Sequence, residues 1–190
     1  MKVVHAESTV LQNVYDGDGK RIKKTESDSI VFTYQGLNVL YEKDLNTGVV
    51  TKRFYANGLQ VAKMVGSTTT YLHEDHIGSI RFVSSATGSQ VFSSNYVPYG
   101  PQYGASGTPD EFLYAGKIYD GSTGLYYFGA RYYDPTIGRF VTQDSYPGSR
   151  ADPQSLNRYI YARDNPMKFI DPTGHAAAHM MFTDSDPFAR

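Results

Sequence analysis

Two aspartates in the last third of the chain could perform acid–base chemistry. Asp144 lies in the segment VTQDSYPG and Asp171 in FIDPTG. Two carboxyl groups held about 3 Å apart cannot both ionise, and the proton they share leaves one acid and one base for water-mediated cleavage of an amide. The alternative is structural, because Asp-Ser and Asp-Pro sequences commonly accept backbone N–H groups in their own turns. The residues alone leave both interpretations open.

Two arginines in the same region, Arg131 and Arg139, are candidate partners for these acids. A guanidinium beside a carboxylate lowers the carboxylate pKa. For both arginines, a structural ion pair is the simpler expectation.

Two clusters of potential metal ligands favour structural interpretations. Residues 73–76 (HEDH) contain metal-binding side chains, but the segment is expected to be a strand that enters a turn at Gly78. Alternate side chains of a strand point to opposite faces, which argues against a shared ion. Residues 16–19 (DGDG) resemble the start of a calcium loop but lack the later acceptors, including Glu at the twelfth position. We therefore predict turns there, with no metal and no cofactor.

A group of aromatic residues offers a second binding hypothesis. Aromatic faces stack on sugar rings, which would give the chain a carbohydrate or cell-surface partner. The stronger alternative is pairing across adjacent strands, each pair stabilising a sheet by about 0.2–1 kcal/mol. The residues concerned are Tyr126, Tyr127, Phe128, Tyr132 and Tyr133. Small-molecule enzymes of several common classes are set aside, because there is no Gly-x-Ser-x-Gly, phosphate loop or dinucleotide fingerprint.

The composition predicts that strands position these residues. The 190 residues are 40% hydrophobic and 14% aromatic, with 17 Tyr and 10 Phe, and such residues suit a pleated, half-buried surface. The 18 Gly and 9 Pro are spread along the whole chain, which indicates frequent turns. We expect many short strands in one structural unit that is long enough to bury a core.

A recurring unit supports an antiparallel arrangement. Aromatic or β-branched residues lead into an acidic turn, a glycine and a second apolar run. Asp, Asn or Thr followed by Gly supplies the positive φ of a tight turn, so each unit is expected to be a hairpin. The copies lie around Gly19, Gly48, Gly78, Gly88, Gly124 and Gly138.

The last third of the chain changes character. Apolar spacing at Leu156, Tyr159 and Ile160 predicts one short helix near residues 153–163 that begins at Asp152-Pro153. The tail, residues 176–190, has no pattern of its own and is expected to be ordered only by docking on another surface.

Charge and cysteine content exclude several classes of partner. The formal net charge is -1 with both signs interspersed, so no basic field favours nucleic acid or an anionic membrane. No apolar run is long enough to insert into a membrane, and no signal peptide is visible. With no Cys, a disulfide framework and a zinc–thiolate site are excluded.

Two longer segments carry a family resemblance. They are GLYYFGARYYDPTIGRFVTQDSYPG (residues 124–148) and LNRYIYARDNPMKFIDPTGH (residues 156–175). They resemble the RHS repeat-associated core, and the upstream YLHEDHIGSIRFV resembles the YD-type repeat that precedes this core. The resemblance covers residues 71–175 closely and residues 10–70 more loosely. We therefore identify the chain as similar to the RHS/YD-repeat family.

The resemblance implies an all-β fold in which an antiparallel YD-repeat sheet winds into part of a hollow shell. It implies three parts: repeat strands in residues 1–97, the core in residues 98–175 and a tail in residues 176–190. The function that follows is a structural and interaction module of a secreted or cell-surface protein. Its expected partners are upstream repeats of a parent polypeptide or other copies of itself.

In toxin-complex members of the family, the core is also a self-cleaving aspartyl protease. Carried over by motif, Asp144 and Asp171 would be the two acids and His175 the residue after which the chain is cut. That position is usually Leu in the family, whereas it is His175 in this sequence. The hypotheses are therefore a shell module, an autoproteolytic core, and a self-assembling filament subunit. For the third, the uncharged segment VFTYQGLNVLY (residues 31–41) is the expected pairing edge.

Overall fold

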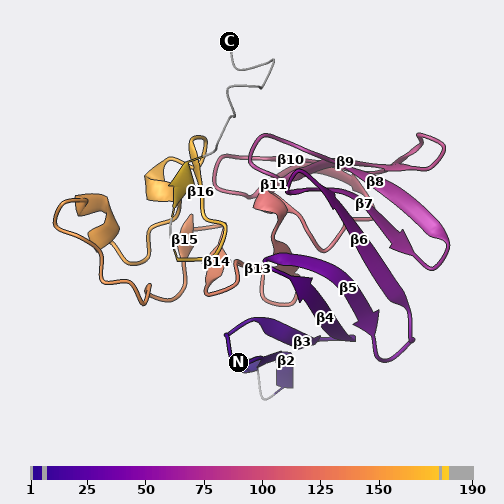
Figure 1. Ribbon diagram of the computed structural model, residues 1–190, viewed down its shortest axis with the longest axis horizontal. Coiled ribbons are helices and arrows are strands. Elements are labelled where there is room, and N and C mark those ends of the chain that lie inside the picture. Colours follow the sequence, from indigo (N-terminus) through magenta and orange to yellow (C-terminus); the bar gives the residue numbers. More distant parts are fainter. Residues whose placement is uncertain (1, 6–7, 176, 180–190) are drawn as a thin grey trace, which may run out of the picture.

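The computed structural model describes residues 2–5, 8–175 and 177–179. Its main element is an eleven-stranded antiparallel sheet in which every strand pairs with its neighbours in chain order (Figure 1). The strands are β1 (Lys2–His5), β2 (Ser8–Tyr15), β3 (Arg21–Thr25), β4 (Ser29–Gln35), β5 (Asn38–Asp44), β6 (Val50–Ala56), β7 (Leu59–Val65), β8 (Thr68–Glu74), β9 (Ile80–Ser85), β10 (Gln90–Tyr96) and β11 (Gln102–Gly107). The prediction of an all-β, antiparallel fold is confirmed.

Turns that contain an aspartate connect the strands of the hairpins, at the positions indicated by the sequence. In the β8–β9 turn, Asp75 Oδ1 accepts the backbone N–H groups of Ile77 at 3.1 Å and Ser79 at 2.9 Å. Gly78 follows with φ +84°, a conformation that side chains with a Cβ rarely adopt. The β2–β3 turn repeats this pattern on Asp16, whose Oδ1 accepts from the backbone of Asp18 and Lys20. Residues 16–19 and 73–79 thus form strand ends and turns, as predicted.

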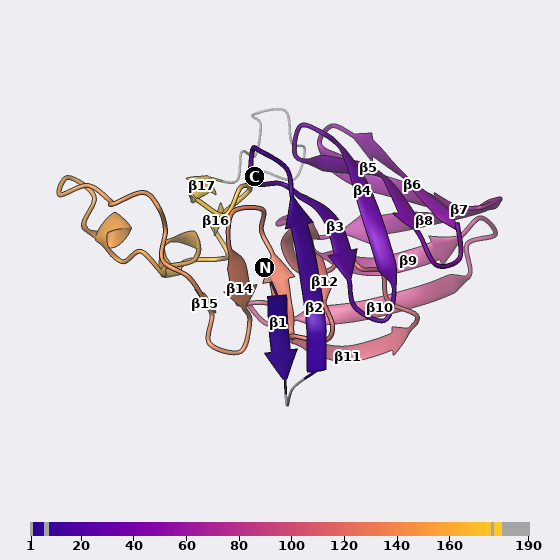
Figure 2. The ribbon, with the colours of Figure 1, turned by 90° about the horizontal axis from the view of Figure 1, so that it is seen from below.

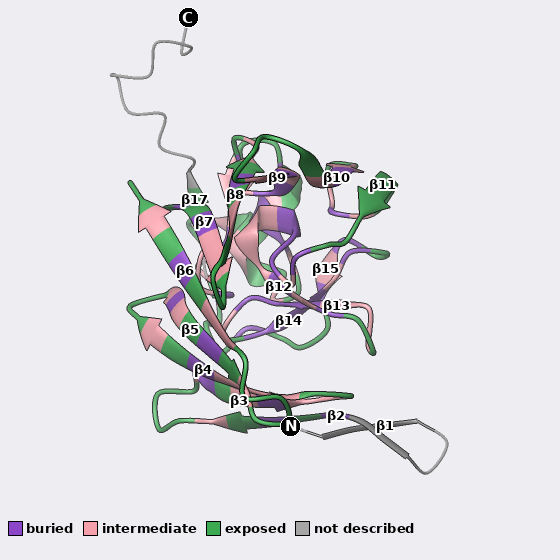
Figure 3. Cartoon of the chain, turned by 90° about the vertical axis from the view of Figure 1, so that its right-hand side faces the viewer, coloured by how far each residue is buried: buried purple, intermediate pink, exposed green. Residues whose placement is uncertain are grey.

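A smaller sheet lies within the curve of the large one (Figures 1 and 3). It contains β12 (Ile118–Asp120), β13 (Leu125–Tyr127), β14 (Tyr132–Asp134) and β15 (Arg139–Phe140), and it is preceded by a 3₁₀ turn, η1 (Tyr114–Gly116). Two further 3₁₀ turns follow, η2 (Pro153–Leu156) and η3 (Ala162–Asp164), and then the paired strands β16 (Phe169–Ile170) and β17 (Ala178–His179). Figure 2 shows this C-terminal part projecting to one side of the sheets.

The predicted helix near residues 153–163 is present only as the separate turns η2 and η3. One continuous helix does not form, because Asn157 (φ -80°, ψ 94°) and Tyr161 (φ -105°, ψ 134°), which lie between the two turns, have extended backbones. Leu156 and Tyr159, which gave the pattern its apolar face, are 52% and 45% exposed. No described helix is long and apolar enough to cross a membrane.

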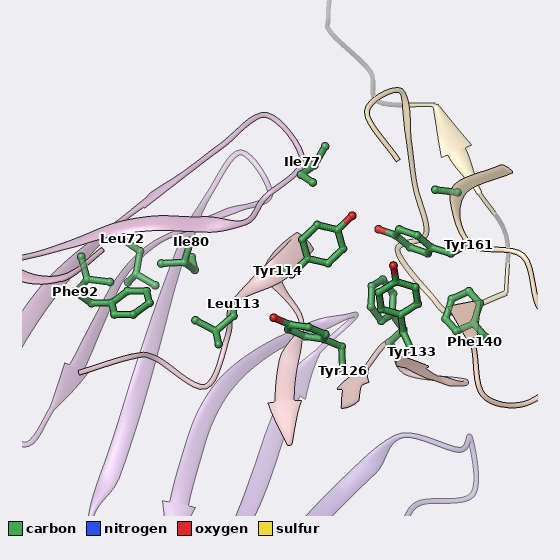
Figure 4. Close-up of a cluster of buried hydrophobic side chains, with 13 residues drawn as sticks. Leu72, Ile77, Ile80, Phe92, Leu113, Tyr114, Tyr126, Tyr133, Phe140 and Tyr161 are labelled. Carbon is green, nitrogen blue, oxygen red and sulfur yellow. The ribbon is translucent and has the colours of Figure 1, made fainter. Parts of the chain in front are cut away.

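The core between the two sheets is largely aromatic (Figure 4). Leu72, Val83 and Phe92 are register partners on β8, β9 and β10, and they present the apolar face of the large sheet. Aromatic residues of the small sheet and of the η3 turn pack beside them; the rings of Tyr133 on β14 and Tyr161 before η3, for example, lie 4.5 Å apart between centroids. Such pairs add roughly 0.5–1.5 kcal/mol beyond their buried area.

The five aromatic residues considered for sugar binding are core residues: Tyr126, Phe128 and Tyr133 belong to this cluster, and Tyr127 and Tyr132 belong to a second cluster with Phe32. Tyr126, Tyr127, Phe128, Tyr132 and Tyr133 are each at most 6% exposed. They therefore offer no ring face to a carbohydrate, and the cross-strand alternative is correct.

Buried ion pairs fasten the core to the concave face of the large sheet. Asp110, in the connection after β11, contacts Arg53 at 2.9 Å and Lys63 at 2.7 Å. Asp120 on β12 contacts Arg21 of β3 at 2.5 Å. Burial alone would raise the pKa of Asp110, but Arg53 and Lys63 hold it below its ordinary value. Since removing one partner would leave a buried charge uncompensated, these pairs fix the placement of the small sheet.

Candidate functional site

The fold brings the two predicted aspartates together on one arginine. Arg131 Nη2 lies 2.9 Å from Asp144 Oδ2 and 3.2 Å from Asp171 Oδ2. All three side chains are buried, with residue exposures of 5%, 6% and 2%. Arg131 comes from the turn between β13 and β14, Asp144 follows β15, and Asp171 follows β16. A guanidinium nitrogen therefore joins the two carboxylates.

Arg131 is held in place from several sides. Its Nη1 donates to the Arg158 carbonyl oxygen at 2.9 Å, and its Nε donates to the carbonyl oxygen of Gly174. The guanidinium carbon lies 3.6 Å from the centre of the Phe140 ring. Burial lowers the pKa of Arg131, and the two carboxylates oppose that change. This arginine is consequently fixed in one orientation between the two acids.

The Asp171 loop is built around its own carboxylate. Asp171 Oδ1 accepts backbone N–H groups from Thr173 at 3.2 Å, Gly174 at 2.7 Å and His175 at 3.2 Å. Gly174 has φ +79°, and a Cβ there would lie 3.0 Å from the Phe128 carbonyl oxygen. The Asp-Pro-Thr-Gly sequence thus makes a tight loop that packs directly on the backbone of the β13–β14 turn.

Asp144 is bound by its own turn and by His175. Its Oδ1 accepts the Tyr146 backbone N–H at 3.0 Å, and the His175 Nδ1 lies 3.2 Å from the same oxygen. The Arg158 guanidinium donates to the Asp144 carbonyl oxygen, through Nε at 2.7 Å and also through Nη2. The imidazole of His175 is half exposed. His175 is therefore in contact with both predicted acids, because its backbone N–H also reaches Asp171.

A cavity of about 340 Å³ opens in front of these groups. Its lining includes Arg131, Asp144, Asp171 and His175 on one side, with Asp152 and Arg163 on another. The last two are joined by a 2.6 Å ion pair. Ala177, just beyond the predicted cleavage position, also lines the cavity. The chain around residue 175 therefore passes close to both carboxylates.

Lys117 supports the loop that carries Asp171, and its role was not predicted from the sequence. Its Nζ donates to the Pro172 carbonyl oxygen at 2.6 Å, inside the Asp171 loop. Burial lowers the pKa of Lys117 to about 8, and the nearby Asp171 partly opposes this. One feature of the sequence could have identified Lys117: it is a single charged residue between Gly116 and the apolar Ile118. An isolated charge in an apolar run needs a partner.

Other candidates lie outside this site. Arg139 pairs with Asp164 at 3.6 Å, with both side chains partly exposed, so its predicted structural role is the one found. His73 donates to or accepts from Ser84 Oγ at 3.0 Å. Among the described residues, no group of three or more potential ligands could hold a metal ion.

The arrangement can serve two purposes. As a structural unit, the single positive charge of Arg131 is shared between two buried carboxylates, and its contacts join three loops. As a chemical unit, two carboxylates lie beside a cavity and close to residue 175, but they meet through Arg131 and not through the shared proton expected from the sequence.

Comparisons with known proteins agree with the fold. A family model described as Teneurin YD-shell matches residues 2–167. The tRNA nuclease WapA of Bacillus subtilis (strain 168) is 36% identical over 169 residues, which are 85% of this chain and 7% of that protein. Salivary gland surface protein 1 of Aedes aegypti is 31% identical over 202 residues, covering 92% of this chain and 6% of that protein.

A solved structure shows the same architecture. The crystal structure of TcdB2-TccC3-Cdc42 matches with a TM-score of 0.70 at 24% identity, over 88% of this chain and 9% of that one. The chain thus spans less than a tenth of the length of each relative named here. The family match, its extent and the chain-ordered β-sheet confirm the resemblance inferred from the sequence: the chain belongs to the Teneurin YD-shell family.

Proposed function

We propose that this chain is a wall segment of a YD-repeat β-shell in a secreted or cell-surface protein. The observation that carries the proposal is the chain-ordered sheet, whose two edges are β1 and β11. A sheet that adds one hairpin per repeat can be extended at an edge without rearrangement. In this proposal residues 1–97 supply wall strands, residues 98–175 form the core and also add the edge strand β11 to the wall, and residues 176–190 are a tail.

The expected partners are YD repeats of the same polypeptide or other copies of the chain. The test is amide hydrogen exchange on the isolated chain and on a fusion in which further YD repeats precede Met1. The fusion should slow exchange in β1, because its free edge groups gain partners. A Gly/Ser-rich leader of equal length is the control. Equal exchange in β1 in the two fusions would contradict the wall proposal.

A second candidate function is self-cleavage after His175, favoured by the placement of Asp144 and Asp171 beside that residue. In the proposed reaction one carboxylate removes a proton from water, and the water oxygen adds to the His175 carbonyl carbon. The bond to the nitrogen of Ala176 then breaks, and the other carboxyl group protonates the departing amine.

This second candidate is tested by the mass of the purified chain under denaturing conditions. Asp144→Asn and Asp171→Asn keep the size of each side chain, but Asn cannot exchange a proton as a carboxyl group does. Cleavage should therefore stop in each single variant. Asp164→Asn is the matched control, because this carboxylate is ion-paired but lies outside the cavity. Continued cleavage in both site variants would show that the two acids do not carry the reaction.

A further inference from the structure

His175 is attached to both carboxylates of the candidate site. Its backbone N–H donates to Asp171 Oδ1 at 3.2 Å, and its imidazole Nδ1 lies 3.2 Å from Asp144 Oδ1. The two contacts have different origins. The first contact is made by the backbone, so any residue except proline could make it at position 175. The second contact requires a side chain with a polar atom at this position.

The imidazole contact completes the hydrogen bonding of Asp144 Oδ1. A carboxylate oxygen offers about two lone-pair directions. The Tyr146 backbone N–H already occupies one of them at 3.0 Å, and His175 Nδ1 takes the other. The second oxygen, Oδ2, faces Arg131 at 2.9 Å. For Oδ1 of Asp144 to accept a proton from water, one of its two contacts must first open.

Of the partners of Asp144, only His175 can leave at low cost. The Tyr146 N–H belongs to the turn that Asp144 itself begins. Arg131 is buried and also bound to the carbonyl oxygens of Arg158 and Gly174. The His175 side chain is 49% exposed and borders the cavity, so its rotation would break no other described contact of the site.

We propose that His175 determines the rate of self-cleavage by occupying Asp144 Oδ1, so that an apolar side chain at this position speeds the reaction. The inference rests on the self-cleavage proposed above. His175 is not a catalytic residue in this scheme. It controls whether Asp144 Oδ1 is free to accept a proton, and in the uncut chain its imidazole occupies that oxygen.

Two nearly isosteric substitutions separate hydrogen bonding from size. In Asn, an amide nitrogen is attached to Cγ, as Nδ1 is in His, so His175→Asn keeps a donor facing Asp144. Leu has the same number and branching of side-chain heavy atoms as Asn, but His175→Leu supplies no donor. The Leu variant should cleave its chain about tenfold faster or more than the wild type, which is the scale of a lost hydrogen bond to a carboxylate. The Asn variant should stay near the wild-type rate.

The measurement is the rate at which the uncut chain disappears from the purified protein, followed by mass spectrometry after denaturation. The double variant with His175→Leu and Asp144→Asn should not cleave, because the faster cleavage expected for His175→Leu depends on the Asp144 carboxylate. Equal cleavage rates in the wild type, the Leu variant and the Asn variant would overturn the role of His175 and leave self-cleavage intact. Absence of cleavage in all three, while thermal unfolding shows that each is folded, would refute self-cleavage and the inference together.

Discussion

Lys117 Nζ lies 2.6 Å from the carbonyl oxygen of Pro172, so a partly buried lysine just before the small sheet holds the loop that carries Asp171. Above this lysine is Phe128, whose ring centre lies 5.3 Å from Nζ. The lysine is therefore enclosed between an aromatic ring and a loop backbone, where its charged form is poorly solvated.

The first prediction concerns the pH dependence that this lysine creates. The folded pKa of Lys117 is about 8, below its ordinary value of 10.5. The unfolded chain therefore binds more protons between these pH values, and the free energy of unfolding should rise with pH across that window. From pH 8 to about 9.5 the rise should be of the order of 2 kcal/mol. Lys117→Met should abolish it in urea unfolding measured at each pH.

Lys52, which is exposed on β6, provides the matched control. Lys52→Met should keep the wild-type rise. A rise that survived in Lys117→Met would mean that the lysine is not desolvated in the folded protein.

The second prediction concerns the close approach of Gly174 to the β13–β14 turn. An added Cβ would lie 3.0 Å from the Phe128 carbonyl oxygen and 3.1 Å from the Arg131 nitrogen, and φ is +79°. Gly174→Ala should therefore lower the free energy of unfolding by roughly 1–3 kcal/mol. Gly121→Ala is the control, because nothing lies within 4 Å of a Cβ there. Chemical denaturation of both variants checks the difference, and equal stabilities would contradict the packing described.

The third prediction follows from Glu74, at the end of β8. Burial raises its pKa from 4.5 to about 7. A raised carboxyl pKa means that the folded state binds the extra proton, so this contribution to stability is complete below pH 4.5 and is lost as the pH rises through about 7. Glu74 is partly exposed, so the loss should be only about 1 kcal/mol.

Glu74→Gln should remove this loss, because an amide does not titrate and its oxygen can still accept the Gln60 backbone N–H that now binds Glu74. The measurement is the unfolding midpoint from pH 4 to 8 in wild type and variant. Asp18→Asn, in the exposed β2–β3 turn, should leave the pH profile of the wild type unaltered. A variant profile that still fell between pH 5 and 7 would contradict the assignment to Glu74.

The fourth prediction concerns self-association through β11. All six residues of this edge strand are exposed and none is charged, so its outer backbone groups are open to another strand. The isolated chain should therefore associate as its concentration rises. Ala105→Lys should weaken association, and Ser67→Lys in the β7–β8 turn should not. Light scattering across micromolar concentrations decides this, and a wild-type particle of constant monomer mass would refute it.

The location of that edge differs from the one expected from the sequence. Residues 31–41 looked suited to pairing between chains, yet they form β4 and β5, and each of these strands has a neighbour on both sides. Composition identified the segment as strand-forming. Whether a strand lies at an edge depends on the order of the whole sheet, which local sequence does not contain.

Local chemistry explains which other predictions succeeded. The turns at Gly19 and Gly78 were predictable because an Asp side chain and a left-handed Gly define them within five residues. The helix near residues 153–163 was not, because the same apolar spacing is compatible with two short turns separated by the extended residues Asn157 and Tyr161. Local spacing carried no sign of those conformations.

The candidate site divides in the same way. Asp144 and Asp171 were selected by family motif, and His175 was named only as the residue after which a cut would fall, so its imidazole contact with Asp144 was not predicted. The bridging position of Arg131 was not predicted, since it needs three loops to meet. Neither was the support from Lys117, whose partner is a backbone carbonyl more than fifty residues away.

The short pairing of β16 with β17 has a consequence for any cut after His175. Phe169 and Ile170 precede the proposed cut, whereas their register partners His179 and Ala178 follow it. Hydrolysis would therefore produce a nick between two strands that remain hydrogen-bonded to each other. Severing the chain and dissociating the fragment would be separate events, so a preparation that runs as a single native particle could already consist of two polypeptides.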